Sequence, residues 1–364
     1  MENTKIAWCD HTFNPWRGCT KVSAGCQNCY ADTQAKRNPK VLGIWGPNGT
    51  RVVASEAMWR EPLKWDRDAE AAGERRRVFC ASMADVFEAW GGPMIDAKGN
   101  PMWWCHGSMS NSPVPAAWNG VLEPGCRWVT MDDIRERLFF LIRDTPNLDW
   151  LLLTKRPENI LGTFGRIDAH DVAEQLPNIW LGTTVENQEQ ADARIPHLLT
   201  APAAVHFLSC EPLLGSIDLQ HIDGGPERCR QCGVVPQINC LHLPNIRCEC
   251  CVEGAESLAW HRLDWVIVGG ESGHGARPMQ LAWARSLVEQ CQHSDTPVFV
   301  KQLGALIHAT NIIDPLDQFP GDVRSFRQGP NEDTIALRLL DDKGGNPDEW
   351  PADLRVREFP KVAA

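Results

Sequence analysis

Short apolar runs, separated by polar or helical stretches, recur along this 364-residue chain. The runs are residues 5–9, 77–83, 150–155, 179–185, 205–210, 265–270 and 298–304. Several are apolar at consecutive positions, which is the pattern of a strand covered on both faces, as in a parallel sheet flanked by helices. The repeated alternation predicts βα units around a parallel sheet or barrel.

Two segments between these runs predict helices. Residues 131–143 and residues 281–291 each place their apolar side chains on one broad face. Thr130 is a suitable N-cap for the first helix, and the Asp132–Asp133 pair suits the positive end of its dipole.

Two segments interrupt the alternation. Residues 91–126 are rich in Gly, Pro, Ser and Asn and predict a long loop, and residues 224–255 predict an inserted mini-domain. Residues 321–364 form a charged, weakly patterned C-terminal extension. We therefore expect the barrel to consist of residues 1–223 and 256–320.

Composition narrows the class of protein. The chain is 43% hydrophobic and 23% charged, as folded proteins are, and its net charge of −11 argues against non-specific binding to nucleic acid. The first residues lack a basic start and an apolar core, and no segment approaches the ~18 apolar residues of a membrane span. We expect a cytoplasmic protein, in a bacterial or phage-infected cell, with no membrane partner.

The fifteen cysteines are unevenly distributed. Three lie within residues 19–29 and six within residues 229–251. Because no export signal is visible and the chain is long for a disulfide framework, we expect reduced thiols and metal sites.

The first cluster has the spacing C-x6-C-x2-C and consists of Cys19, Cys26 and Cys29. A structural zinc ion and a fully cysteine-ligated [4Fe–4S] cluster each take four protein ligands. Three cysteines therefore predict a [4Fe–4S] cluster with one open iron, at which S-adenosylmethionine could bind and be cleaved reductively.

A zinc site is the alternative for the first cluster. Its fourth ligand would be a distant residue, and the candidates are Cys9, His11 and Cys80. Spacing alone leaves this alternative open.

The second cluster consists of two C-x2-C pairs separated by fifteen residues, namely Cys229 with Cys232 and Cys248 with Cys251. This spacing predicts a zinc ribbon that staples the insertion. Cys240 or Cys250 could replace one member, and a second iron–sulfur cluster is the competing interpretation.

A set of longer motifs adds a family resemblance. The motifs are residues 14–23 (NPWRGCTKVS), 25–31 (GCQNCYA), 82–87 (SMADVF), 153–157 (LTKRP), 180–182 (WLG), 185–187 (VEN), 208–209 (LS), 211–215 (EPLLG), 269–273 (GGESG) and 301–302 (KQ). Together they resemble the phage Gp37/Gp68 family, a three-cysteine-motif family of the DUF5131 type.

That family looks like a divergent branch of the radical S-adenosylmethionine superfamily, whose usual signature is C-x3-C-x2-C followed by an aromatic residue. The C-x2-C pair and Tyr30 fit this signature, whereas the first gap is three residues longer. Gly269-Gly270-Glu271 follows the sixth apolar run, not the second as in the superfamily. The resemblance implies a partial TIM-like barrel, an electron donor as partner, and a nucleotide or nucleic acid as substrate.

Polar residues gather where the predicted strands end, which is where the active site of a βα barrel lies. The candidate cofactor-binding residues are Tyr30, Ser82, Asp85, Lys155, Glu186, Glu211, Glu271 and Lys301. Carboxylates among them could bind the methionine ammonium or ribose hydroxyls, and the cations, with Arg156, a carboxylate or phosphate. The alternative for each is a solvated strand end.

The sequence thus predicts an enzyme that cleaves S-adenosylmethionine to a 5′-deoxyadenosyl radical. The competing hypothesis is a non-catalytic protein, stapled by metal at both cysteine clusters, that acts through a protein partner.

Overall fold

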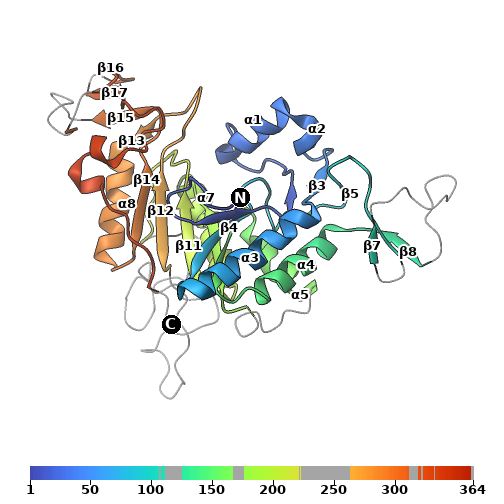
Figure 1. The fold of residues 1–364 in the computed structure, drawn as a ribbon. Helices are drawn as coiled ribbons and strands as arrows, with labels where there is room; N and C mark the ends of the chain where they lie inside the picture. Colours follow the sequence, from blue (N-terminus) through green and yellow to red (C-terminus); the bar gives the residue numbers. More distant parts are fainter. Residues whose placement is uncertain are drawn as a thin grey trace, which may run out of the picture. The chain divides into compact units, whose positions relative to one another are not determined.

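The computed structural model describes residues 1–105, 108–110, 125–166, 176–220, 222, 263–310, 319–320, 323–331 and 333–361. The chain divides into two compact units, Met1–Trp180 and Leu181–Ala364. Each unit has its own parallel strands and helices (Figure 1). The α/β fold class that the apolar runs predict is therefore confirmed.

Three parallel strands form the centre of the first unit. They are β1 (His11–Phe13), β4 (Arg76–Cys80) and β9 (Leu148–Thr154), in the order β1-β4-β9. Phe13 is paired with Cys80, and Cys80 with Leu152, so the carboxyl ends of the strands lie at one edge. Nearly every side chain of β9 is buried, as its continuous apolar run predicts.

Helices cover these strands. Those of the first unit are α1 (Tyr30–Arg37), α2 (Pro39–Leu42), α3 (Glu56–Ala72), α4 (Met131–Arg143) and α5 (Ile160–Arg166), with 3₁₀ turns η1 (Ala24–Cys26) and η2 (Pro157–Asn159). Helix α3 packs against β4 and β9. Phe13 meets the rings of Trp59 and Trp150 edge-on, with centroids 5.1 and 5.7 Å away, and ties helix and strands into one core.

Two small sheets complete the first unit. Their strands are β2 (Trp16–Arg17), β3 (Arg51–Val53) and β5 (Met94–Ile95), and β6 (Trp103–Cys105), β7 (Ser108–Ser110) and β8 (Cys126–Trp128). Residues 91–126, which the sequence predicts as a long loop, thus contain short strands. The Gly- and Pro-rich composition of this range gave no sign of them. A disulfide joins Cys105 to Cys126, so the expectation of reduced thiols is wrong for this pair.

The second unit contains a parallel set and a smaller mixed sheet. Its strands are β10 (Ile179–Thr184, starting just before the boundary), β11 (Val205–Cys210), β12 (Trp265–Gly269) and β14 (Val298–Gln302), in that order, and β13 (Met279–Gln280), β15 (Ile307–Thr310), β17 (Thr334–Arg338) and β16 (Ser325–Gln328). Its helical segments are α7 (Gln188–Leu199), α8 (Leu281–His293), η5 (Pro347–Glu349) and η6 (Ala352–Leu354). Helix α8 packs against β12 and β14.

The first apolar run does not form the strand it predicts. Trp8 and Cys9 are buried, but the chain turns at this point and β1 begins at His11. The other six runs each contain a strand. The predicted weakly patterned extension contributes β16, β17 and two 3₁₀ turns.

Within the described ranges, no helix has both the length and the apolar character needed to cross a bilayer. The predicted insertion at 224–255 lies outside the described residues.

Candidate functional site

The first three-cysteine cluster lies on one loop of the first unit, which we call the cysteine loop (residues 19–29). Cys19 follows β2, Cys26 ends η1, and Cys29 immediately precedes α1. The three thiols are partly exposed, and none of them is in a disulfide. The backbone N–H of Cys29 donates to the Cys26 carbonyl at 3.4 Å, so this pair sits on a single turn.

Backbone contacts hold Cys19 from both sides. The Gly18 N–H donates to the Met83 carbonyl at 3.0 Å, and the Gly46 N–H donates to the Cys19 carbonyl at 3.1 Å. Met83 lies just beyond the carboxyl end of β4. Cys19 is thereby fixed at the carboxyl edge of the parallel strands.

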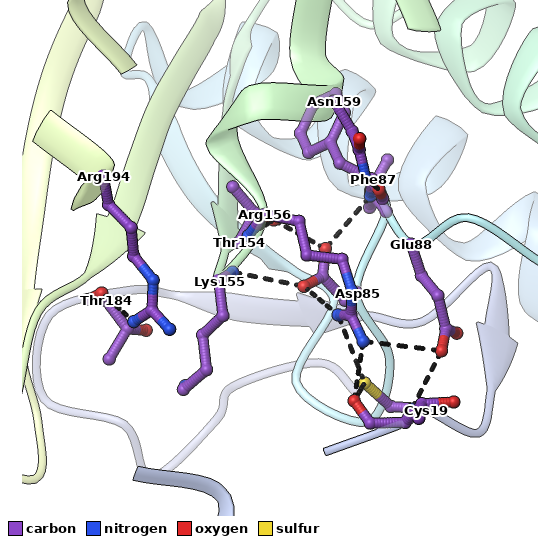
Figure 2. A network of polar contacts seen from close by, with 12 residues as sticks. Cys19, Asp85, Phe87, Glu88, Thr154, Lys155, Arg156, Asn159, Thr184 and Arg194 are labelled. Atoms are coloured by element: carbon purple, nitrogen blue, oxygen red, sulfur yellow. Dashed lines mark hydrogen bonds and ion pairs between the residues drawn. The ribbon is translucent and has the colours of Figure 1, made fainter. Parts of the chain in front are cut away.

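The residue after Cys19 is held by three buried charged side chains. The Thr20 N–H donates to Glu88 Oε1 at 2.9 Å, its carbonyl accepts from Arg156 Nη2 at 2.6 Å, and its hydroxyl accepts from Arg51 Nη2 at 2.9 Å. With Asp85, these charged residues form a network that we call the charged clamp (Arg51, Asp85, Glu88 and Arg156; most of it in Figure 2).

Ion pairs hold the charged clamp together. Arg51 forms two hydrogen bonds with the Glu88 carboxylate, at 2.7 and 2.8 Å, and both side chains are almost fully buried. Arg156 Nη1 donates to Asp85 Oδ2 at 2.7 Å. Asp85 Oδ1 in turn accepts from Thr154 Oγ1 at 2.7 Å, which ties the clamp to the end of β9.

Arg156 also reaches the cysteine loop directly. Its Nη1 lies 3.8 Å from Cys19 Sγ, within hydrogen-bond distance for sulfur (Figure 2). Burial alone would lower the pKa of Arg156, but Asp85, Cys19 and Glu88 together raise it. The guanidinium therefore remains charged beside the thiol.

The Cys19 thiol resists ionisation. Burial raises its pKa to about 12, and the carboxylates of Asp85 and Glu88 add to this effect, while Arg156 opposes it. A metal or cluster that binds Cys19 must displace this proton.

Tyr30 and Ser82, two of the predicted cofactor-binding residues, contact each other. The Tyr30 hydroxyl donates to the Ser82 carbonyl at 2.7 Å, and Asn14 Nδ2 donates to the Ser82 hydroxyl at 3.1 Å. These bonds tie the start of α1 to the turn after β4, so both residues help to position the cysteine loop.

A pocket of about 740 Å³ opens beside the charged clamp. Thr20, Glu88 and Arg156 form part of its wall, and Lys155 and Asn159 also line it. The segment from Ala89 to Pro93 and residues 47–49 line it as well. Thr20, which follows Cys19, and Arg156, which contacts Cys19 Sγ, are therefore both part of the pocket wall.

The candidates in the second unit are engaged in ion pairs. Glu186 is fully buried and accepts from Arg194 Nη1 of α7 at 2.8 Å. Lys301 Nζ lies 2.9 Å from Glu211 Oε1, which joins the ends of β14 and β11.

Glu271 is also paired. It accepts from the backbone N–H and from Nε of Arg277, at 2.8 and 3.0 Å. Glu186, Glu211 and Glu271 thus lie just beyond the carboxyl ends of β10, β11 and β12. Each of these glutamates already has a cationic partner.

Comparison with known proteins assigns the chain to a family. The family model described as protein of unknown function DUF5131 matches residues 3–91 and 129–343. The chain belongs to this family. No curated protein and no solved structure matches it.

The DUF5131 match includes the complete cysteine loop and all four residues of the charged clamp. It leaves out residues 92–128, the range in which β5 to β8 interrupt the βα alternation. The site described here therefore lies in the part of the chain that the family shares.

Among the described residues of this DUF5131 protein, no three His, Cys, Asp or Glu side chains form a group that could hold a metal ion. The donors that the chain offers to a metal group are the three thiols of the cysteine loop, none of which is in a disulfide. A structural zinc ion takes four protein ligands, whereas a [4Fe–4S] cluster with one open iron takes three thiolates, each on a different iron atom. The number of thiols on the loop therefore matches the ligand number of such a cluster.

Sequence reasoning missed two members of the clamp, Arg51 and Glu88. Glu88 directly follows the SMADVF motif, and that proximity is a signal that could have identified it. Arg51 stands in a short strand with no motif around it. The cysteines of the second cluster, Cys229, Cys232, Cys248 and Cys251, lie outside the described residues.

Proposed function

We propose that Cys19, Cys26 and Cys29 hold a [4Fe–4S] cluster with one open iron, and that the chain is an iron–sulfur enzyme of the radical S-adenosylmethionine type. The observation that carries the proposal is the placement of three free thiols on one loop at the carboxyl edge of the parallel strands. Active sites of parallel βα folds lie at this edge.

When bound, such a cluster supplies the electron that cleaves S-adenosylmethionine to methionine and a 5′-deoxyadenosyl radical. The chain's own residues prepare the site. The charged clamp fixes Thr20 and hence the position of Cys19, and the Tyr30–Ser82 bond fixes the start of α1 behind Cys29. The adjoining pocket of about 740 Å³ offers space for a ligand of nucleotide size.

We further propose that the fold is a partial TIM-like barrel and that the protein acts in the cytoplasm. We also propose a divergent relationship to radical S-adenosylmethionine enzymes and to the phage Gp37/Gp68 family. An electron-donor protein must deliver the electron, and the proposed substrate is a nucleotide or nucleic acid. The net charge of −11 favours a small or protein-presented substrate over bare DNA.

The second cysteine cluster is proposed as a zinc site. Its two C-x2-C pairs have the spacing of a zinc ribbon, and four thiolates complete a tetrahedral ion. A second iron–sulfur cluster is the competing occupant.

The test is anaerobic reconstitution with iron and sulfide, reduction in the presence of S-adenosylmethionine, and chromatographic assay of 5′-deoxyadenosine. We expect brown protein and product formation, and loss of both in Cys19→Ala. Cys9→Ala is the matched control, because Cys9 is a buried thiol outside the cysteine loop and a candidate ligand of the zinc alternative.

A fully loaded cluster that forms no 5′-deoxyadenosine would contradict the enzymatic part of the proposal. Colourless protein with two zinc ions per chain would instead favour the non-catalytic, metal-stapled protein that acts through a partner. Loss of metal in Cys9→Ala would point to the zinc site completed by that residue.

A further inference from the structure

We infer that Arg156 sets the reduction potential of the cluster by stabilising its reduced form through Cys19. This inference rests on the proposed cluster. Arg156 is a positioning and tuning residue that touches one thiol ligand: its Nη1 lies 3.8 Å from Cys19 Sγ. Hydrogen bonds and charge near the ligand sulfurs are among the features that determine the potential of iron–sulfur clusters.

The geometry of Arg156 is held from three directions. Nη1 donates to Asp85 Oδ2 at 2.7 Å, Nη2 donates to the Thr20 carbonyl at 2.6 Å, and Glu88 Oε1 lies 3.6 Å from Nη2. The side chain is only 9% exposed, so water screens its charge weakly. A cation fixed in this way acts on the sulfur without first having to reorient.

The charge balance of the clamp gives the direction of the effect. Two arginines face two carboxylates, so the clamp as a whole is neutral. One electron from a low-potential donor protein makes the cluster site one charge more negative. The guanidinium beside Cys19 stabilises this charge, whereas a clamp that lacks Arg156 is left with one uncompensated carboxylate that opposes it.

Arg51 provides an internal comparison. It is fully buried, pairs with Glu88 and donates to the Thr20 hydroxyl and the Thr50 carbonyl. None of these hydrogen bonds goes to Cys19 Sγ. A substitution of Arg51 therefore perturbs the packing of the clamp, and one of Arg156 also removes the hydrogen bond to the sulfur.

The experiment uses the full chain, reconstituted anaerobically, as wild type, Arg156→Gln, Arg156→Lys and the control Arg51→Lys. The midpoint potential is measured by redox titration, with the reduced cluster followed by electron paramagnetic resonance. Because Arg156→Gln removes a positive charge and a hydrogen bond beside Cys19 Sγ, we expect it to lower the equilibrium constant for one-electron reduction about tenfold or more, which is a shift of about 59 mV or more.

Arg156→Lys keeps the charge and is expected to shift the potential less, in the same direction, while Arg51→Lys stays close to wild type. An unchanged potential in Arg156→Gln, or an equal shift in Arg51→Lys, would overturn the inference. If Arg156→Gln fails to hold a cluster, the potential of Arg156→Lys decides: a negative shift supports the inference and no shift overturns it. Failure of the wild type to bind a cluster would instead reject the proposed function.

Discussion

Gly18 shows how a single residue shapes the cysteine loop. Its φ angle is +116°, a conformation that glycine adopts readily and other residues rarely do. A Cβ at this position would lie 2.4 Å from the Thr50 carbonyl oxygen, which belongs to backbone and cannot swing away. The backbone conformation immediately before Cys19 therefore requires glycine at position 18.

Gly18→Ala is expected to destabilise the first unit. A strained backbone costs about 1–3 kcal/mol, and the contact with Thr50 adds to this, so the free energy of unfolding should fall by about 2 kcal/mol or more. Urea denaturation of the metal-free protein measures this change, and iron analysis after reconstitution should show reduced loading.

Gly91→Ala is the matched control, since its Cβ would point into open space. We expect it to stay within about 0.5 kcal/mol of wild type. Equal free energies of unfolding for the two variants would show that position 18 tolerates a side chain.

At the scale of elements, α4 follows its sequence pattern closely. It begins at Met131 and ends at Arg143, as predicted. Thr130 and Asp133 form a capping box: the Asp133 N–H donates to the Thr130 hydroxyl at 3.3 Å, and the Thr130 N–H donates to Asp133 Oδ2 at 2.8 Å. The predicted N-cap is confirmed because capping depends on residues only three positions apart.

Asp133→Asn is expected to lower the free energy of unfolding by about 1 kcal/mol at pH 7. Burial acts to raise the pKa of Asp133, but hydrogen bonds from Arg127 and Thr130 outweigh it and lower the pKa below the ordinary 3.8. The unfolded state therefore takes up the proton first as the pH falls. The stabilisation is present above pH 3.8 and is lost as the pH falls through the folded-state pKa.

Urea denaturation should show a difference in the free energy of unfolding between wild type and Asp133→Asn. We expect this difference to stay constant from pH 7 downward and to begin to shrink only near pH 4. Glu136→Gln, an exposed carboxylate on the same helix, is the control and should change stability little. If this difference in the free energy of unfolding already disappeared near neutral pH, the role of the ionised Asp133 would be contradicted.

At the scale of the whole molecule, the two cysteine clusters are far apart in the sequence, and we expect them to load with metal independently. Wild-type protein should contain about four iron atoms and about one zinc ion per chain. The triple variant Cys19→Ala, Cys26→Ala, Cys29→Ala should lose the iron and keep the zinc, as measured by plasma mass spectrometry.

The double variant Cys229→Ser, Cys232→Ser is the reciprocal control and should lose zinc while it keeps iron. Loss of iron in both variants, with zinc absent from the wild type, would indicate iron–sulfur clusters at both positions.

The sequence by itself determined the elements and the three cysteines. Continuous apolar runs located six strands, helical periodicity located α4 and α8, and spacing singled out Cys19, Cys26 and Cys29. These features depend on neighbours within about one or two turns of chain, so a local pattern carries them.

Only the tertiary structure decided what surrounds Cys19. Arg156 lies 137 positions from Cys19, and Arg51 lies 37 positions from Glu88, so no local pattern relates them. The structure also pairs Glu186, which the sequence suggested for cofactor binding, with Arg194. Such partners are selected because a buried charge must be compensated, and folding alone determines which side chain is close enough to do so.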